Sequence, residues 1–205
     1  GNPVYAINVM LWAAAGYLSG GVLFSYLIPK VLFNKDVRDF NEDKNPGAAN
    51  AFKACGLLIG LLCVVLDVIK AAVPVKLAIT VGGLDGMALI PAAIAPVLGH
   101  AFPPYFRFHG GKAIAASFGS MLGLFPDYKA IVLWVAAILV MLPFLGRNHS
   151  KLIIASSFIC STACVVLYFT QIHIWIIAVS ITAILWYKHL PEVSKSKSAA
   201  RAKLS

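Results

Sequence analysis

Charged residues are scarce in this sequence. Asp, Glu, Lys and Arg together make up 12% of its 205 residues, whereas soluble domains carry about 25%. Hydrophobic residues make up 60%, and the mean hydropathy is +0.84. A chain of this length cannot bury so much apolar surface within itself. Soluble, disordered and collagen-like proteins are therefore excluded, and the composition predicts a protein that spans the membrane several times, with lipid as the solvent for its apolar surface.

The sequence also lacks the residue groups that hold metals or disulfides. The four cysteines all lie in apolar stretches and are Cys55, Cys63, Cys160 and Cys164. None stands at zinc-ligand spacing from a histidine, and their spacing suggests no disulfide framework. We interpret them as small buried hydrophobic residues and expect no metal site.

Apolar runs with the length of transmembrane helices recur along the chain. They fall near residues 4–33, 55–75, 77–99, 113–126, 130–146, 152–170 and 172–188. The first is too long for a signal peptide, the fourth is short, and Gly-rich residues 82–86 interrupt the third. We predict an all-α bundle of seven transmembrane helices that forms a single integral-membrane domain over residues 1–190, followed by a basic cytoplasmic tail over residues 191–205.

Basic residues are distributed unevenly between the two sides of this predicted bundle. The segments that share one side are residues 34–54, 100–112, 147–151 and the tail after Tyr187. They hold most of the 17 Lys and Arg residues, and the other side has little beyond Lys76 and Lys129. Cytoplasmic loops carry an excess of Lys and Arg, so we place these segments and the carboxyl terminus in the cytoplasm and the amino terminus outside. The net charge of +9 then reflects topology, and we expect no nucleic-acid partner.

Two of the predicted cytoplasmic loops contain distinctive motifs. Residues 45–47 (Asn-Pro-Gly) are a strong turn signal within the first loop. Residues 110–112 (Gly-Gly-Lys) end the second loop at a helix start. There, free amide groups, the helix dipole and the lysine charge could bind a phosphate, or the lysine could snorkel beside a simple turn. The spacing is not that of a Walker A motif.

Ionisable residues in or beside the membrane are further candidates. Asp67 and Lys70 stand three apart on the second span, a spacing that allows an ion pair. Charges in a span are costly, so this pair indicates either a functional role or a structural clasp between helices. Four histidines fall at the predicted cytoplasmic face: His100, His109, His149 and His189. Each could carry a proton near neutral pH or be an interfacial polar residue.

Several motifs together resemble one known family. They are Asp36-x-Arg38, residues 45–50 (Asn-Pro-Gly-Ala-Ala-Asn), Asp67-x-x-Lys70, Gly99-His100-x-Phe102-Pro103, Phe106-x-Phe108-x-Gly110-Gly111-Lys112 and Tyr187-Lys188-His189. These motifs are similar to those of the bacterial glycerol-3-phosphate acyltransferases that use acyl phosphate (the PlsY type). The resemblance extends over nearly the whole chain, and the motif that ends in Lys112 is the most specific.

The chain departs from the family pattern at three places. Residues 42–44 (Glu-Asp-Lys) stand at the position of the serine in the family's first motif, with one extra residue in the loop. Lys53 stands where the family has an arginine, which keeps the charge but loses bidentate reach to phosphate. Residues 189–192 (His-Leu-Pro-Glu) lack the asparagine of the family's third motif.

The resemblance implies a seven-helix bacterial plasma-membrane protein with its amino terminus outside and its active-site loops in the cytoplasm. It implies transfer of a fatty acyl group from acyl phosphate to the 1-hydroxyl of glycerol 3-phosphate, giving lysophosphatidic acid and phosphate. We expect no metal, cofactor or acyl carrier, and a monomer whose partners are these two substrates and the lipid bilayer. Because no Ser or Cys nucleophile stands beside a histidine in these motifs, we expect direct attack by the hydroxyl.

The resemblance also implies roles for individual residues. The expected catalytic residues are His189, Lys112 and Asn50, with His100 as a second choice for the proton acceptor. The expected substrate-binding residues are Arg38, Asn45, Gly47, Lys53, His100, Gly110, Gly111, Arg147 and Ser150. Their cationic and amide groups would hold two anions together and stabilise the charge that develops in the reaction.

Other functional classes stay open. A relative that binds or transports an anionic lipid or solute without catalysis would also account for the altered first and third motifs. A channel or transporter would account for the interrupted third span, but it leaves the Gly-Gly-Lys loop unexplained. A CDP-alcohol phosphotransferase fits less well, because the spaced aspartates of that class are missing.

Overall fold

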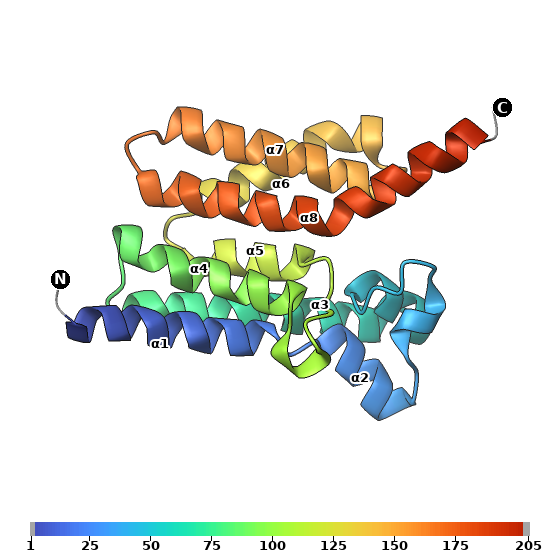
Figure 1. Ribbon diagram of the computed structural model, residues 1–205, viewed down its shortest axis with the longest axis horizontal. Helices are drawn as coiled ribbons and strands as arrows, with labels where there is room; N and C mark the ends of the chain where they lie inside the picture. Colours follow the sequence, from blue (N-terminus) through green and yellow to red (C-terminus); the bar gives the residue numbers. More distant parts are fainter. Residues whose placement is uncertain (1–2, 203–205) are drawn as a thin grey trace. The chain divides into compact units, whose positions relative to one another are not determined.

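The computed structural model describes the backbone of residues 3–202 and the side chains of residues 3–196 and 198. The described chain consists of eight α-helices and two short 3-10 helices (Figure 1), which confirms the prediction of an all-α fold. Four of these helices are long and apolar enough to cross a membrane, and the number of candidate spans is five if the bent pair Pro3–Gly20 and Phe24–Phe33 forms one span. The helices Ile114–Gly123 and Lys129–Leu145 are apolar but shorter. The count of seven spans stays a prediction.

The chain divides into two compact units, residues 1–128 and residues 129–205. Each is described by itself, and the single domain expected over residues 1–190 stays a prediction. The first unit begins with α1 (Pro3–Gly20) and α2 (Phe24–Phe33), which lie on either side of a break with a bend of 42°. The span expected over residues 4–33 is therefore two helices. The break at residues 21–23 leaves backbone groups outside the helical hydrogen bonds, and the side chains of Asp67 and Lys70 pair with the Phe24 N–H and the Val22 carbonyl.

Helix α3 (Ala48–Thr80) is longer than the span expected over residues 55–75 and is kinked. Gly56 has φ 82° and ψ −175° inside it, a conformation that favours glycine because it has no Cβ. The kink interrupts the helical hydrogen bonds, and the Nζ of Lys35 donates to the carbonyl of Ala54 at 2.6 Å. The kink thus separates a short helix over residues 48–55 from the long apolar one.

Helix α4 (Gly86–Ala101) packs closely on α1. A Cβ on Gly20 would lie 2.1 Å from the carbonyl oxygen of Pro96, so the two backbones are in direct contact. The third span was expected over residues 77–99 with an interruption, but the Gly-rich stretch is the connection between α3 and α4. After the 3-10 helix η2 (Pro104–Phe106) the chain enters α5 (Ile114–Gly123), which packs on α3.

The second unit consists of α6 (Lys129–Leu145), α7 (His149–Leu167) and α8 (Ile172–Ala202), with α7 packed against both others (Figure 1). Indole N–H groups join the helices: the Nε1 of Trp134 donates to the Oγ of Ser156 at 3.1 Å. Helix α8 continues past residue 191, so the expected tail begins as helix. Of its basic residues, Lys203 and the side chains of Lys197 and Arg201 lie outside the described residues.

Candidate active site

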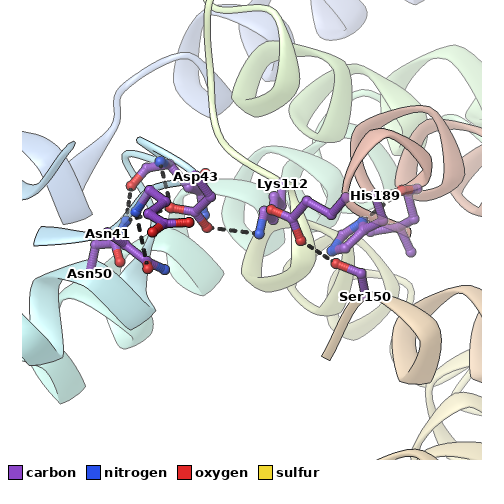
Figure 2. Close-up of polar contacts among 10 residues, drawn as sticks. Asn41, Asp43, Asn50, Lys112, Ser150 and His189 are labelled. Atoms are coloured by element: carbon purple, nitrogen blue, oxygen red, sulfur yellow. Dashed lines mark hydrogen bonds and ion pairs between the residues drawn. The ribbon is translucent and has the colours of Figure 1, made fainter. Parts of the chain in front are cut away.

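Asp43 is the centre of a polar group in the first unit. Its Oδ1 accepts hydrogen bonds from the backbone N–H of Asn45 at 3.0 Å and from the Nδ2 of Asn50 at 3.1 Å. Its Oδ2 pairs with the Nζ of Lys112 at 2.9 Å (Figure 2). The side chains of Asp43 and Lys112 are only 18% and 14% exposed. Asp43 therefore connects three predicted site residues, Asn45, Asn50 and Lys112, which come from two segments far apart in the sequence. Asp43 itself was not among the predicted site residues.

The charge state of Asp43 follows from this environment. Partial burial raises the pKa of its carboxyl group, but hydrogen bonds from Lys112, the Asn45 amide and Asn50 outweigh burial and bring the pKa below its usual value. Asp43 is therefore ionised at neutral pH. One feature of the sequence could have identified Asp43 as a site residue: it is an acidic residue in a loop whose other residues were predicted to bind anions.

Asn50 is buried, with 1% of its surface exposed. Its Nδ2 donates both to Asp43 and to the backbone carbonyl of Asn45, at 2.7 Å. Both partners are acceptors, so they fix the orientation of the amide. The Oδ1 of Asn50 consequently faces away and has no hydrogen-bond partner among the described residues, which leaves a buried acceptor for a ligand hydroxyl.

The Gly110-Gly111 segment does not offer the free amide groups that were predicted. The N–H of Gly110 donates to the carbonyl of Ala101 at 3.2 Å, and that of Gly111 donates to the carbonyl of His100 at 3.1 Å. These bonds fold the loop back on the end of α4. A Cβ on Gly111 would lie 2.4 Å from the Nε2 of His100, so glycine is needed here for close approach, and Lys112 follows directly.

Other predicted binding residues have different environments. The guanidinium of Arg38 pairs with Asp36 at 2.6 Å and lies 4.9 Å from the ring centre of Tyr26. This hydrogen bond outweighs partial burial and lowers the pKa of Asp36. Gly47 is the N-cap residue that precedes α3, and a Cβ on it would lie 2.5 Å from the Nδ2 of Asn45. Lys53 is exposed, one helical turn after Asn50.

A buried ion pair lies behind this site. The Nζ of Lys70 contacts Asp67 Oδ1 at 2.9 Å, the carbonyl of Val22 at 2.7 Å and the Nδ1 of His100 at 2.7 Å. An ammonium has three N–H donors and no acceptor, so these three contacts match its full capacity. The side chains of Lys70 and Asp67 are only 2% and 1% exposed.

Asp67 completes the contacts at the break between α1 and α2. It accepts hydrogen bonds from the backbone N–H of Phe24 at 3.2 Å and from the hydroxyl of Ser25. The pair therefore replaces hydrogen bonds that the helix break removes, which matters because unpaired backbone groups are costly in a membrane. Of the two interpretations left open for Asp67 and Lys70, these contacts favour the structural clasp.

The same clasp decides the tautomer of His100. Lys70 donates to Nδ1, so this nitrogen holds the lone pair of a neutral imidazole and the proton resides on Nε2. His100 is thus a hydrogen-bond donor on the side that faces Gly111. In this tautomer Lys70 occupies the lone pair of His100, and the role of His100 as a second choice for the proton acceptor stays a prediction.

The second unit contains a separate group of predicted site residues. His189 is fully buried on α8, and its Nδ1 lies 2.7 Å from the carbonyl of Leu185. A carbonyl only accepts, so Nδ1 carries the proton and Nε2 holds the lone pair of the neutral ring. The hydroxyl of Ser150 on α7 donates to Glu192 (Figure 2), whereas Arg147 is exposed. Glu192, like Asp43, was missing from the prediction.

No group of three or more His, Cys, Asp or Glu side chains in the described part of the chain could hold a metal ion. The expectation of a reaction without metal or cofactor stays a prediction.

The sequence of residues 10–198 matches the family model of the glycerol-3-phosphate acyltransferases. This chain belongs to that family. The resemblance expected from the motifs is confirmed. Among curated relatives, the glycerol-3-phosphate acyltransferase of Macrococcus caseolyticus is 30% identical over 198 residues, which cover 97% of this chain and 98% of the relative. That of Enterococcus faecalis is 28% identical over 207 residues, which cover 97% of this chain and 93% of the relative.

Similarity to glycerol-3-phosphate acyltransferase 2 of Thermotoga maritima is higher but local. It is 43% over 109 residues, which are 53% of this chain and 55% of the relative, so the match spans about half of that protein. The crystal structure of PlsY (YgiH), an integral membrane glycerol 3-phosphate acyltransferase, in its glycerol 3-phosphate form has a TM-score of 0.77 and 26% identity. The match covers 93% of this chain and 92% of that one. The chain is therefore an integral membrane protein with the fold of this bacterial family.

Loss of the buried ion pair between Lys70 and Asp67 should lower the stability of the fold. Lys70→Met leaves the Asp67 carboxylate and the Val22 carbonyl buried without the ammonium, and we expect the free energy of unfolding to fall by about 3–5 kcal/mol. Thermal unfolding of the purified protein in detergent measures this. Lys30→Met removes an exposed lysine of α2 and is the control, with an expected change below about 1 kcal/mol. Equal unfolding midpoints for the two variants would contradict the clasp.

Proposed function

We propose that the chain transfers a fatty acyl group from acyl phosphate to the 1-hydroxyl of glycerol 3-phosphate, forming lysophosphatidic acid for phospholipid synthesis. The observation that carries this proposal is the convergence of Lys112, Asn50 and the Asn45 amide on a single anionic group. Donors with this combination of charge and direction bind phosphate as well as carboxylate. Family membership supplies the reaction class.

The glycerol part of the substrate would lie beside this anion site. The buried Oδ1 of Asn50 has no hydrogen-bond partner among the described residues, and an unpaired buried acceptor costs about 1–3 kcal/mol. A glycerol hydroxyl can satisfy it while the phosphate contacts Lys112. Lys53, one turn further along α3, adds positive charge on the exposed side.

His100 and His189 would have different roles in the reaction because their tautomers differ. His189 presents the lone pair of Nε2 and accepts the proton of the attacking hydroxyl. His100 presents an N–H on Nε2 and donates a hydrogen bond to a phosphate or to the developing oxyanion. The grouping of His189 with the first unit in one site is part of this proposal.

The reaction would proceed by direct attack. The glycerol oxygen forms a bond to the acyl carbon, the bond from that carbon to the phosphate oxygen breaks, and inorganic phosphate leaves with the electron pair. The proton passes to His189 and from there to phosphate. Binding both anions at one cationic site contributes orientation, which accounts for a large share of rate enhancement in reactions of two substrates.

The proposal includes topology and assembly. The amino terminus lies outside the bacterial plasma membrane, the carboxyl terminus and the motif loops lie in the cytoplasm, and the chain acts as a monomer. The excess of Lys and Arg in these loops supports this orientation.

A second candidate is an anion-binding relative without catalysis. Asp43 already pairs with Lys112, and this contact favours the second candidate if no ligand can displace the carboxylate.

Phosphate release distinguishes the two candidates. We expect the purified protein to release phosphate from acyl phosphate only when glycerol 3-phosphate is present, and Lys112→Ala to lower the rate by about 10²–10³-fold because a charge that stabilises the transition state is lost. Lys30→Ala, on the exposed side of α2, serves as the control and keeps the rate. Binding of glycerol 3-phosphate without phosphate release would favour the second candidate.

The proton-acceptor role of His189 has its own test. In His189→Asn, the side-chain amide can still donate to the Leu185 carbonyl, but no lone-pair nitrogen remains, so we expect kcat to fall by about 10²–10⁴-fold with little change in KM. His173→Asn on the same helix is the control. A normal kcat in His189→Asn would exclude His189 as the base.

A further inference from the structure

The carboxylate of Asp43 has the hydrogen-bonding environment of a bound ligand. A lysine ammonium, a side-chain amide and a backbone N–H all donate to its two oxygens at 2.9–3.1 Å. Such a mixture of donors is typical of sites that bind the oxygens of a phosphate. The side chain of the protein thus fills the position that the proposed function assigns to a substrate group.

The local chain conformation places Asp43 there. Asn41 accepts from the backbone N–H of Lys44 at 3.1 Å through its carbonyl and from that of Glu42 at 3.2 Å through its Oδ1. Lys44 has a φ of 49°, in the left-handed region that non-glycine residues seldom adopt. The whole turn over residues 41–44 is exposed, but it directs the carboxylate of Asp43 to Lys112, so that the side chain of Asp43 is only 18% exposed.

Occupation by Asp43 and occupation by a phosphate exclude each other. Two anions at one lysine repel strongly where water is partly excluded, and the donors of Asn45 and Asn50 cannot serve both. The turn lies on the protein surface, so the carboxylate can move into water when a ligand with higher charge takes its donors. A dianion gains more from Lys112 than a monoanion does, whereas the cost of moving Asp43 is the same for both.

We propose that Asp43 is a specificity-determining residue of this site: its carboxylate competes with the ligand for Lys112, Asn50 and the Asn45 amide. Phosphate dianions, which gain more from Lys112, then displace it at concentrations at which monoanions do not. This inference rests on the proposed function, because it takes the phosphate of glycerol 3-phosphate as the displacing group. Asp43 lies in the segment 42–44, where this chain departs from the first motif of the family.

Calorimetric titration of the protein in detergent with glycerol 3-phosphate tests the competition. Asp43→Asn keeps an acceptor oxygen but removes the charge, and we expect its Kd to be roughly fivefold lower than that of the unchanged protein, the factor that corresponds to loss of one partly exposed ion pair. Glu42→Gln removes the same charge from the neighbouring exposed residue and should change Kd less than twofold. An unchanged or higher Kd in Asp43→Asn would mean that Asp43 only holds Lys112 in place, and would overturn the proposal.

Titration with the sulfate ester of glycerol, a monoanion of similar shape, tests the selectivity. In the unchanged protein we expect the sulfate ester to bind more weakly than the phosphate. In Asp43→Asn we expect both Kd values to fall by a similar factor of roughly five, because the cost of moving Asp43 is the same for both ligands. An unchanged Kd for the sulfate ester in Asp43→Asn would contradict the exclusion of monoanions by Asp43. Thermal unfolding verifies the fold of each variant, and Asp43→Ser provides the same comparison if the asparagine variant is unstable.

The outcomes separate this inference from the proposed function. Coupled phosphate release with equal Kd values in the unchanged protein and Asp43→Asn would overturn only the role of Asp43. Absence of both glycerol 3-phosphate binding and phosphate release in every variant would overturn the proposed function, and this inference with it.

Discussion

The ammonium of Lys70 is the contact on which the first unit depends. It contacts the Val22 carbonyl at the break between α1 and α2, the Asp67 carboxylate on its own helix α3, and the His100 ring at the end of α4. A charged group buried in a membrane protein is tolerated only when its partners compensate for the lost hydration. Here all three donors have acceptors, so one side chain satisfies a helix break and orients a histidine at the same time.

This constraint connects the fold to the proposed chemistry. Because Lys70 holds the Nδ1 of His100, the ring presents a donor to the loop that contains Gly111 and Lys112. His189 has the opposite tautomer because a helix carbonyl holds its Nδ1 proton. A family reaction that needs one proton acceptor and several donors for anions can therefore use two histidines in different roles.

Composition and motifs predicted the membrane class, the all-α fold and the family, because these depend on hydrophobic runs and on local residue patterns. They did not predict the break at residues 21–23 in the first apolar run, since the groups that stabilise it come from α3. Nor could they predict that the amides of Gly110 and Gly111 are used within a hairpin. Asp43 was missed for the same reason: its partner Lys112 is 69 residues away, and only the folded chain brings them together.

The proposed function requires that the motif loops of the first unit and the carboxyl-terminal end of α8 lie in the cytoplasm. Single cysteines at exposed Asp39, His109 and Ser194, in a background without the four native cysteines, can be labelled in oriented vesicles with a thiol reagent that does not cross membranes. We expect labelling of all three from the cytoplasmic face alone, and of a cysteine at Thr170 from the opposite face. Labelling of Ser194→Cys from the face opposite to Asp39→Cys and His109→Cys would contradict this requirement.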